Sequence, residues 1–191
     1  MKFDNALSYP PRQGVNSFID QEDYSVQYSS FDEIVSIVSD LGKGTLLGIR
    51  YIKSAFRLLP VHRADFELLG IFFEEQYNVD KCLPMGCSIS CSLFEKCSSF
   101  IQWVVGKPTG KKSLAHYLND LLFAGKKGTN DCTLLVCFEW GVPIVDEKSK
   151  GPFTNLVFLG FEIDTIEMVI KIPHEKLICL KSLLEPLLWK R

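Results

Sequence analysis

Residues 114–125, Leu-Ala-His-Tyr-Leu-Asn-Asp-Leu-Leu-Phe-Ala-Gly, are the stretch that decides the fold. Mainly apolar residues lie on both sides of Asn119-Asp120, a pair of residue types that favours turns. The stretch predicts two antiparallel strands, Leu114 to Leu118 and Leu121 to Ala124, with a tight turn at Asn119-Asp120. A carboxylate and an amide are therefore expected at the tip of an apolar hairpin.

Helical and extended patterns surround this hairpin. A helical stripe of apolar residues starts at Phe31, after Ser30 and Glu33, which resemble a capping box, and stops at Gly42. The other expected elements are strands at Leu46–Ile52, Glu67–Phe73 and Gln76–Asp80, a helix of about four turns after Gly86, a helix at Asn130–Trp140, a hairpin made by Val157–Ile163 and Met168–Ile172, and an amphipathic helix at His174–Leu188. This order is that of an α+β domain whose antiparallel sheet is covered by helices on one face.

The composition fits one ordinary domain that does not bind nucleic acid through a large net positive charge. Of 191 residues, 47% are hydrophobic, and 21 Lys and Arg oppose 23 Asp and Glu, giving a formal charge of −2. Any polyanion site must be local, and residues 107–127 form the most basic segment, with five Lys and one acid. No apolar run reaches the roughly 18 residues that span a bilayer, so we expect a soluble protein of the cytoplasm or nucleus.

The seven cysteines are an odd number, and no secretory signal precedes them. A disulfide framework is therefore not expected. Cys82, Cys87 and Cys91 lie close together, but they lack the two-residue spacing of a zinc knuckle, and no His is nearby. Buried free thiols are the better interpretation.

Five motifs in order along the chain resemble those of reverse transcriptases. Tyr117-Leu118-Asn119-Asp120 resembles the Tyr-x-Asp-Asp box with its third position changed, and Tyr51 to Phe56 resembles the first palm motif with its Asp replaced. The other three are Leu83-Pro84-Met85-Gly86, which resembles the turn that opens the palm helix, Gly141 to Lys148, which is similar to the fourth motif, and Phe158-Leu159-Gly160, which is similar to the primer-grip hairpin. The residues in and around these motifs are most similar to the reverse transcriptases of DIRS-type, tyrosine-recombinase retrotransposons, and the resemblance covers about Leu7 to Lys176.

The resemblance implies an α+β reverse-transcriptase-like palm with an antiparallel sheet and packed helices. It implies a partial fingers segment at 1–50, the palm at 51–165, and the end of the primer-grip hairpin with the start of a thumb at 166–191. The expected partners are an RNA template and a DNA primer, and the expected cofactor is Mg²⁺. No membrane partner is expected.

The resemblance also assigns roles to individual residues. Asp120 keeps a catalytic and metal-binding position, whereas Tyr51 and Asn119 replace the two other catalytic Asp residues. The residues expected to bind nucleotide are Phe56, Met85, Gly86 and Lys148. The residues expected to contact nucleic acid are Lys111, Lys112, Lys126, Lys127, Phe158, Leu159 and Gly160.

These replacements argue against full catalysis. Two Mg²⁺ ions require hard oxygen ligands, chiefly carboxylates, and this site retains one of three. Tyr51 supplies a neutral phenol at pH 7 and Asn119 a neutral amide. The nearby acids Asp146, Glu147, Glu162 and Asp164 do not obviously reach the site. The sequence thus predicts a retrotransposon reverse transcriptase domain that is catalytically impaired or a remnant, and the alternative is a non-catalytic nucleic-acid-binding module.

Overall fold

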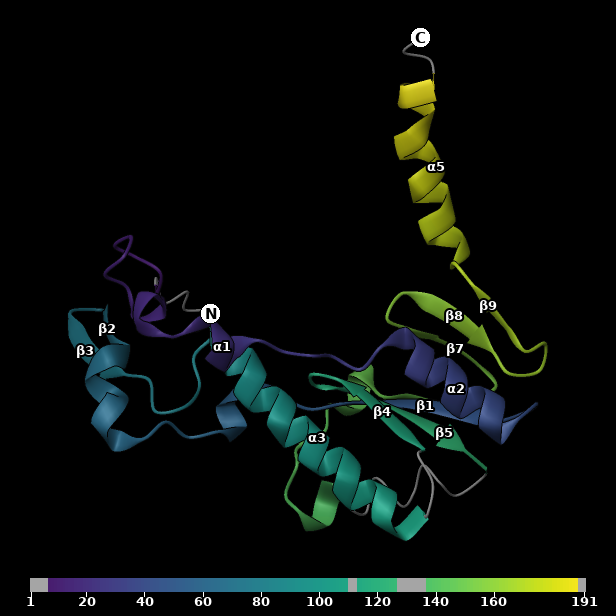
Figure 1. The fold of residues 1–191 in the computed structure, drawn as a ribbon, viewed down its shortest axis with the longest axis horizontal. Coiled ribbons are helices and arrows are strands. Elements are labelled where there is room, and N and C mark those ends of the chain that lie inside the picture. Colours follow the sequence, from purple (N-terminus) through teal and green to yellow (C-terminus); the bar gives the residue numbers. More distant parts are fainter. Residues whose placement is uncertain (1–6, 110–112, 127–136, 189–191) are drawn as a thin grey trace.

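The computed structural model describes residues 7–109, 113–126 and 137–188. Its centre is a four-stranded antiparallel sheet in the order β4-β5-β1-β6 (Figure 1). The strands are β1 (Leu46–Tyr51), β4 (Leu114–Tyr117), β5 (Asp120–Gly125) and β6 (Lys150–Phe153). The predicted hairpin at 114–125 therefore forms one side of the sheet, and β1 pairs with it along the whole of β5.

Helix α2 (Phe31–Leu41) begins and ends where the sequence predicts. The Ser30 hydroxyl accepts a hydrogen bond from the Glu33 backbone N–H at 3.3 Å, which satisfies one of the free donors of the first turn. At the other end, Gly42 adopts a φ of +84°, a conformation that favours glycine, and its N–H donates to the Val38 carbonyl.

The sheet is covered on both faces, which corrects the prediction of one covered face. Alternate residues of a strand point to opposite faces. The face made by Leu47, Ala115, Leu122 and Ala124 packs against α2 and against a second sheet. The opposite face, made by Leu114, Leu121 and Phe123, packs against α3 (Ser90–Thr109), which is longer than the four turns expected.

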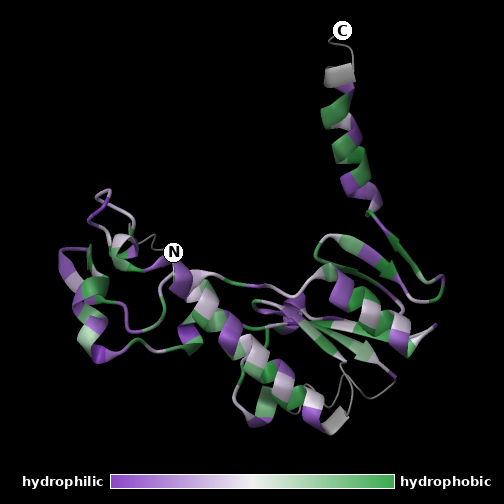
Figure 2. Ribbon diagram, viewed as in Figure 1, coloured by the Kyte–Doolittle hydropathy of each residue, from purple (hydrophilic) through white to green (hydrophobic). Residues whose placement is uncertain are grey.

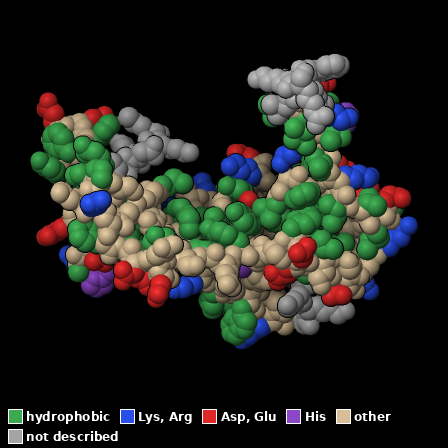
Figure 3. Space-filling model, turned by 45° about the horizontal axis from the view of Figure 1, so that its top comes forward, with side chains coloured by type: hydrophobic (Ala, Val, Ile, Leu, Met, Phe, Trp, Pro, Cys, Tyr) green, Lys and Arg blue, Asp and Glu red, His purple; other side chains and the backbone are tan. Residues whose placement is uncertain are grey.

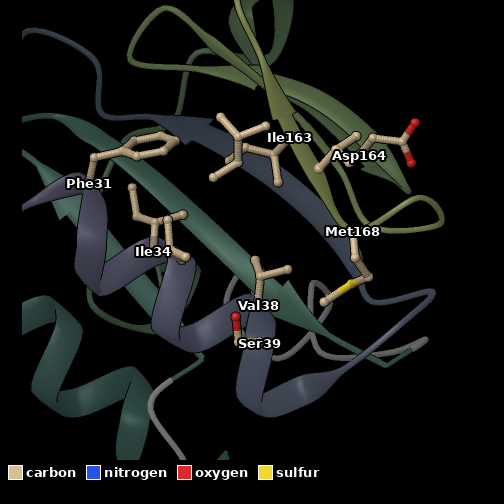
Figure 4. A pocket seen from close by; sticks show the side chains of 10 residues that line it. Phe31, Ile34, Val38, Ser39, Ile163, Asp164 and Met168 are labelled. Carbon is tan, nitrogen blue, oxygen red and sulfur yellow. The ribbon is translucent and has the colours of Figure 1, made fainter.

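The second sheet has three strands instead of the predicted single hairpin. They are β7 (Asn155–Phe158), β8 (Phe161–Asp164) and β9 (Val169–Lys171), paired antiparallel in that order. The chain reverses at Leu159-Gly160, where both residues have positive φ, so the expected strand Val157–Ile163 is itself a hairpin. Figure 4 shows Phe31, Ile34 and Val38 of α2 facing Ile163 and Met168 across a small apolar cavity.

Two parts of the chain extend from this core in Figure 1. One end holds the hairpin of β2 (Gly70–Phe73) and β3 (Gln76–Val79) near the first helical segments, and α5 (His174–Leu188) projects from the other end. Figure 2 shows hydrophobic residues distributed along α5. The remaining short helices are η1 (Val15–Phe18), α1 (Gln21–Tyr24), η2 (Ala55–Leu58), η3 (Arg63–Leu69) and η4 (Asp146–Lys148).

The α+β prediction is confirmed, and several expected elements occur with changed bounds. The strand expected from Glu67 begins at Gly70, because residues 63–69 form η3. Most of the helix expected at 130–140 lies outside the described residues. The described cysteines are free thiols, but Cys137 alone among them is buried, whereas Cys179 is exposed. Within the described residues, no helix is long and apolar enough to cross a membrane.

Candidate functional site

The tip of the β4–β5 hairpin differs by one residue from the prediction. The two turn residues are Leu118 and Asn119, and Leu118 takes a positive φ of +51°. Asp120 is therefore the first residue of β5, paired with Tyr117 on one side and with Tyr51 at the end of β1 on the other. Because cross-strand partners point to the same face, the side chains of Tyr51, Tyr117 and Asp120 share one face of the sheet.

Asn119 is held by the end of β1. Its backbone carbonyl accepts a hydrogen bond from the Ile52 N–H at 2.9 Å. Its side-chain amide lies 3.5 Å from the Ile52 carbonyl, at the outer limit of a hydrogen bond. The position that resembles a catalytic Asp thus presents its amide nitrogen to a backbone carbonyl.

Lys148 completes this group from η4. Its ammonium nitrogen lies over the ring of Tyr51, 4.4 Å from the ring centroid, a cation–π arrangement. The backbone fixes this position, because the Val145 N–H donates to the Tyr51 carbonyl at 2.8 Å and Ile144 forms a β-bridge with Ile52. Burial raises the pKa of Asp120 above its ordinary value, and the positive charge of Lys148 partly opposes that rise.

A polar cluster behind the hairpin was missed by the sequence analysis. The Nε2 atom of His116 lies 2.8 Å from Glu95 Oε1, and its Nδ1 atom lies 2.5 Å from Gln102 Oε1. Gln102 donates its amide N–H to the Leu114 carbonyl at 2.8 Å, so its oxygen faces the ring. Both ring nitrogens therefore face side-chain oxygen atoms.

A signal for this cluster was present in the sequence. Glu95 and Gln102 are seven residues apart, so they lie on one side of α3, and His116 is a polar residue inside an apolar strand. The cluster connects α3 to the β4–β5 hairpin. The Ser98 hydroxyl of α3 makes a further link, because it donates to the Leu118 carbonyl at 2.7 Å. Glu95 Oε2 is buried and has no hydrogen-bond partner among the described residues.

Tyr28 is a second residue that the sequence analysis missed. Its ring packs against that of Tyr117, with 4.8 Å between the centroids. Burial is the main reason that the pKa of the Tyr28 phenol is raised, so it stays neutral at pH 7. Tyr28 belongs to the extended segment before α2. This segment has no periodic pattern, so the contact of Tyr28 with Tyr117 was not predictable from the sequence.

The residues expected to bind nucleotide lie on three segments, one of which is η4 with Lys148. Phe56 in η2 is half-buried and packs edge-on against Phe94, with 5.8 Å between centroids. Met85 is 56% exposed, and Gly86 adopts a φ of +87° that favours glycine. Asn16 holds this turn by donating to the Gly86 carbonyl at 2.8 Å and accepting from the Ser88 N–H at 2.9 Å.

The residues expected to contact nucleic acid differ in their exposure to solvent. Phe158 is buried in the core with α2, so its side chain is withdrawn from the surface, whereas Leu159 and Gly160 form the exposed turn. The ammonium of Lys176 lies against Gly160, where a Cβ atom would clash with it. Lys126 is exposed immediately after β5. The predicted contacts Lys111, Lys112 and Lys127 lie outside the described residues.

The donor set at Asp120 does not fit a pair of Mg²⁺ ions. One carboxylate stands beside a phenol, an amide turned to a carbonyl, and an ammonium group. Within the described ranges, no three His, Cys, Asp or Glu side chains gather into a group that could hold a metal ion. The structure therefore brings Tyr51, Asn119, Asp120 and Lys148 together in an arrangement unsuited to two-metal chemistry.

Two of the acids considered as replacements are engaged elsewhere. Glu162 accepts a hydrogen bond from the Asn155 side chain at 2.8 Å, and Asp164 accepts from the backbone N–H groups of Ile166 and Glu167, each at 3.0 Å. Both lie on β8 in the second sheet. They belong to the local structure of that sheet.

Comparison with known proteins identifies the fold as reverse-transcriptase-like. The structure matches the foamy viral protease-reverse transcriptase in complex with double-stranded DNA, with a TM-score of 0.69 and 16% identity, over 88% of this chain and 28% of that one. It matches the same viral protein in complex with an RNA/DNA hybrid with a TM-score of 0.68 and 17% identity, over 89% and 22%. The chain thus spans about a quarter of these proteins. No protein-family model and no curated protein matches the sequence.

Proposed function

We propose that this chain is the palm region of a reverse transcriptase of DIRS-type retrotransposon origin that binds an RNA template with a DNA primer and does not carry out two-metal nucleotide addition. The observation that carries this proposal is the Tyr51–Asp120 strand pair. In this proposal the pair occupies the position of the palm site but holds one carboxylate, and the Lys148 ammonium lies over the Tyr51 ring.

The chemical argument concerns charge. Two divalent ions carry four positive charges, which three carboxylates offset largely and one carboxylate offsets poorly. The pKa of Asp120 is already raised by burial, so its environment disfavours even one negative charge. Residual Mg²⁺ binding at Asp120 would therefore be weak, and an RNA-directed DNA polymerase activity is not what these side chains support.

The binding part of the proposal rests on the fold and on local positive charge. The structural neighbours named above are complexes with double-stranded DNA and with an RNA/DNA hybrid. Figure 3 shows Lys and Arg side chains interspersed with acidic ones on the visible face, which fits a local binding site better than a broad basic surface. In this proposal residues 51–165 are the palm, 1–50 belong to the fingers, and 166–191 complete the primer-grip hairpin and begin a thumb.

Two assays on the same preparation test the proposal. Primer extension on an RNA template with Mg²⁺ or Mn²⁺ is expected to give no processive product, while a fluorescein-labelled RNA–DNA hybrid is expected to bind in a salt-dependent way. Processive synthesis would refute the loss of catalysis. Absence of hybrid binding at low salt would refute the binding function and leave a remnant without activity.

A further inference from the structure

The ammonium group of Lys148 is held at a defined point of the palm. It lies 4.4 Å from the centre of the Tyr51 ring. Tyr51 is the strand partner of Asp120. The η4 turn that carries it is tied down on both sides. Val145 donates to the Tyr51 carbonyl at 2.8 Å, the Ser149 hydroxyl donates to the Val145 carbonyl at 2.8 Å, and Lys150 pairs with Ile49 of β1.

The charge at this point is less negative than that of a three-carboxylate site. Three carboxylates without metal carry three negative charges and repel a phosphodiester until divalent cations neutralise them. Here the negative charge of Asp120 is matched by the single positive charge of Lys148, which is near enough to oppose in part the rise that burial causes in the pKa of that carboxyl. The replacement of Asp by Tyr at 51 removes one repelling charge and adds a ring face that attracts the ammonium.

We propose that Lys148, positioned by the Tyr51 ring, takes the electrostatic place of the divalent ions and holds a backbone phosphate of the bound nucleic acid without any metal. This inference rests on the proposed nucleic-acid-binding function and specifies how its site works. Lys148 is exposed, so its donors remain available to a phosphate on the side away from the ring. Tyr51 acts as a positioning residue through the face of its ring.

The test is a set of binding isotherms. A fluorescein-labelled RNA–DNA hybrid is titrated with the full chain in EDTA and in Mg²⁺, at several salt concentrations. We expect the same affinity in EDTA and Mg²⁺. Lys148→Met should weaken binding several-fold and lower the slope of log affinity against log salt by about one, because one phosphate contact is lost.

Tyr51 gives a matched pair of variants. Tyr51→Phe keeps the ring face and should bind like the wild type, whereas Tyr51→Leu removes it and should weaken binding. Lys43→Met is the control for general charge loss, because Lys43 is exposed and precedes β1 at the end opposite Tyr51. Circular dichroism and a urea melt of each variant establish that it is folded.

The outcomes separate the inference from the function on which it rests. Hybrid binding that requires Mg²⁺ would overturn the inference and leave the nucleic-acid-binding function standing. Binding in EDTA that Lys148→Met reduces no more than Lys43→Met would also overturn it. Equal losses in Tyr51→Phe and Tyr51→Leu would remove the role given to the ring face. No binding of the hybrid by the wild type under any condition would overturn the proposed function itself.

Discussion

Tyr51 and Asp120 lie directly opposite each other on the neighbouring antiparallel strands β1 and β5. Cross-strand partners of this kind have Cβ atoms about 4.5–5.5 Å apart. A carboxylate at position 51 would therefore lie close enough to Asp120 for both to bind one ion.

The first prediction concerns restoration of metal binding. Tyr51→Asp combined with Asn119→Asp should bind Mn²⁺ more tightly than the wild type in isothermal titration calorimetry, because three carboxylates would then lie close together at the hairpin tip and the end of β1. The Lys148 ammonium lies 4.4 Å from the centre of the Tyr51 ring, so it would be near a carboxylate at position 51 and should compete with the ion. Adding Lys148→Met should tighten Mn²⁺ binding further, by roughly tenfold, which corresponds to about 1.4 kcal/mol.

The control for this experiment is Lys148→Met alone, which leaves one carboxylate and should bind Mn²⁺ no better than the wild type. If the double variant gained no Mn²⁺ affinity even with Lys148→Met, the placement of Tyr51 and Asn119 at the family's metal positions would be wrong.

The sequence pointed to the residues that meet here but not to their contacts. Local patterns sufficed for the hairpin and for α2, because turn residues, apolar alternation and the Ser30 cap act within a few residues. The position of Lys148 over Tyr51 depends on β6 pairing with β1, a long-range contact that no local pattern specifies. The coverage of both sheet faces was missed because helix periodicity does not tell which face a helix will cover.

The second prediction uses the raised pKa of Asp120. A carboxyl whose folded-state pKa lies above its ordinary value of 3.8 destabilises the fold once it is ionised. Stability should therefore fall as the pH rises from that value through the higher folded-state pKa. Asp120→Asn lacks this charge, so it should be more stable than the wild type at pH 7, and the difference should shrink toward pH 4.

Urea unfolding at several pH values measures this effect. Glu67→Gln, on the exposed part of η3, is measured in parallel to give the effect of removing an exposed carboxylate. A constant stability difference between Asp120→Asn and the wild type from pH 4 to pH 7 would contradict the role given to burial of this carboxyl.

The third prediction concerns the buried pair of His116 and Glu95. Their side chains are 4% and 11% exposed, so removing His116 leaves the buried Glu95 side chain without its hydrogen-bond partner. His116→Leu should cost about 1–3 kcal/mol in unfolding free energy. The double variant with Glu95→Leu removes both polar groups and should be more stable than His116→Leu alone. A double variant less stable than either single variant would show that the pair is not coupled in this way.

The last prediction concerns Gly151, the second residue of β6, which follows the η4 turn that carries Lys148. Its φ is +94°, and a Cβ atom built there would lie 2.5 Å from the Leu47 carbonyl oxygen and 2.8 Å from the Gly48 Cα atom. Both contacts are with the backbone of β1, so Gly151→Ala must either displace β6 or adopt a strained conformation. We expect it to lose at least about 2 kcal/mol of unfolding free energy.

The same substitution at Gly106 provides the comparison. Gly106 lies inside α3, and a Cβ atom added there would meet nothing within 4 Å, so Gly106→Ala should stabilise the fold by about 0.5–1 kcal/mol. Opposite signs for the two variants in urea unfolding would tie the cost at Gly151 to the close approach of β6 and β1. A neutral Gly151→Ala would mean that β6 is not held against β1 as tightly as the position of Lys148 requires.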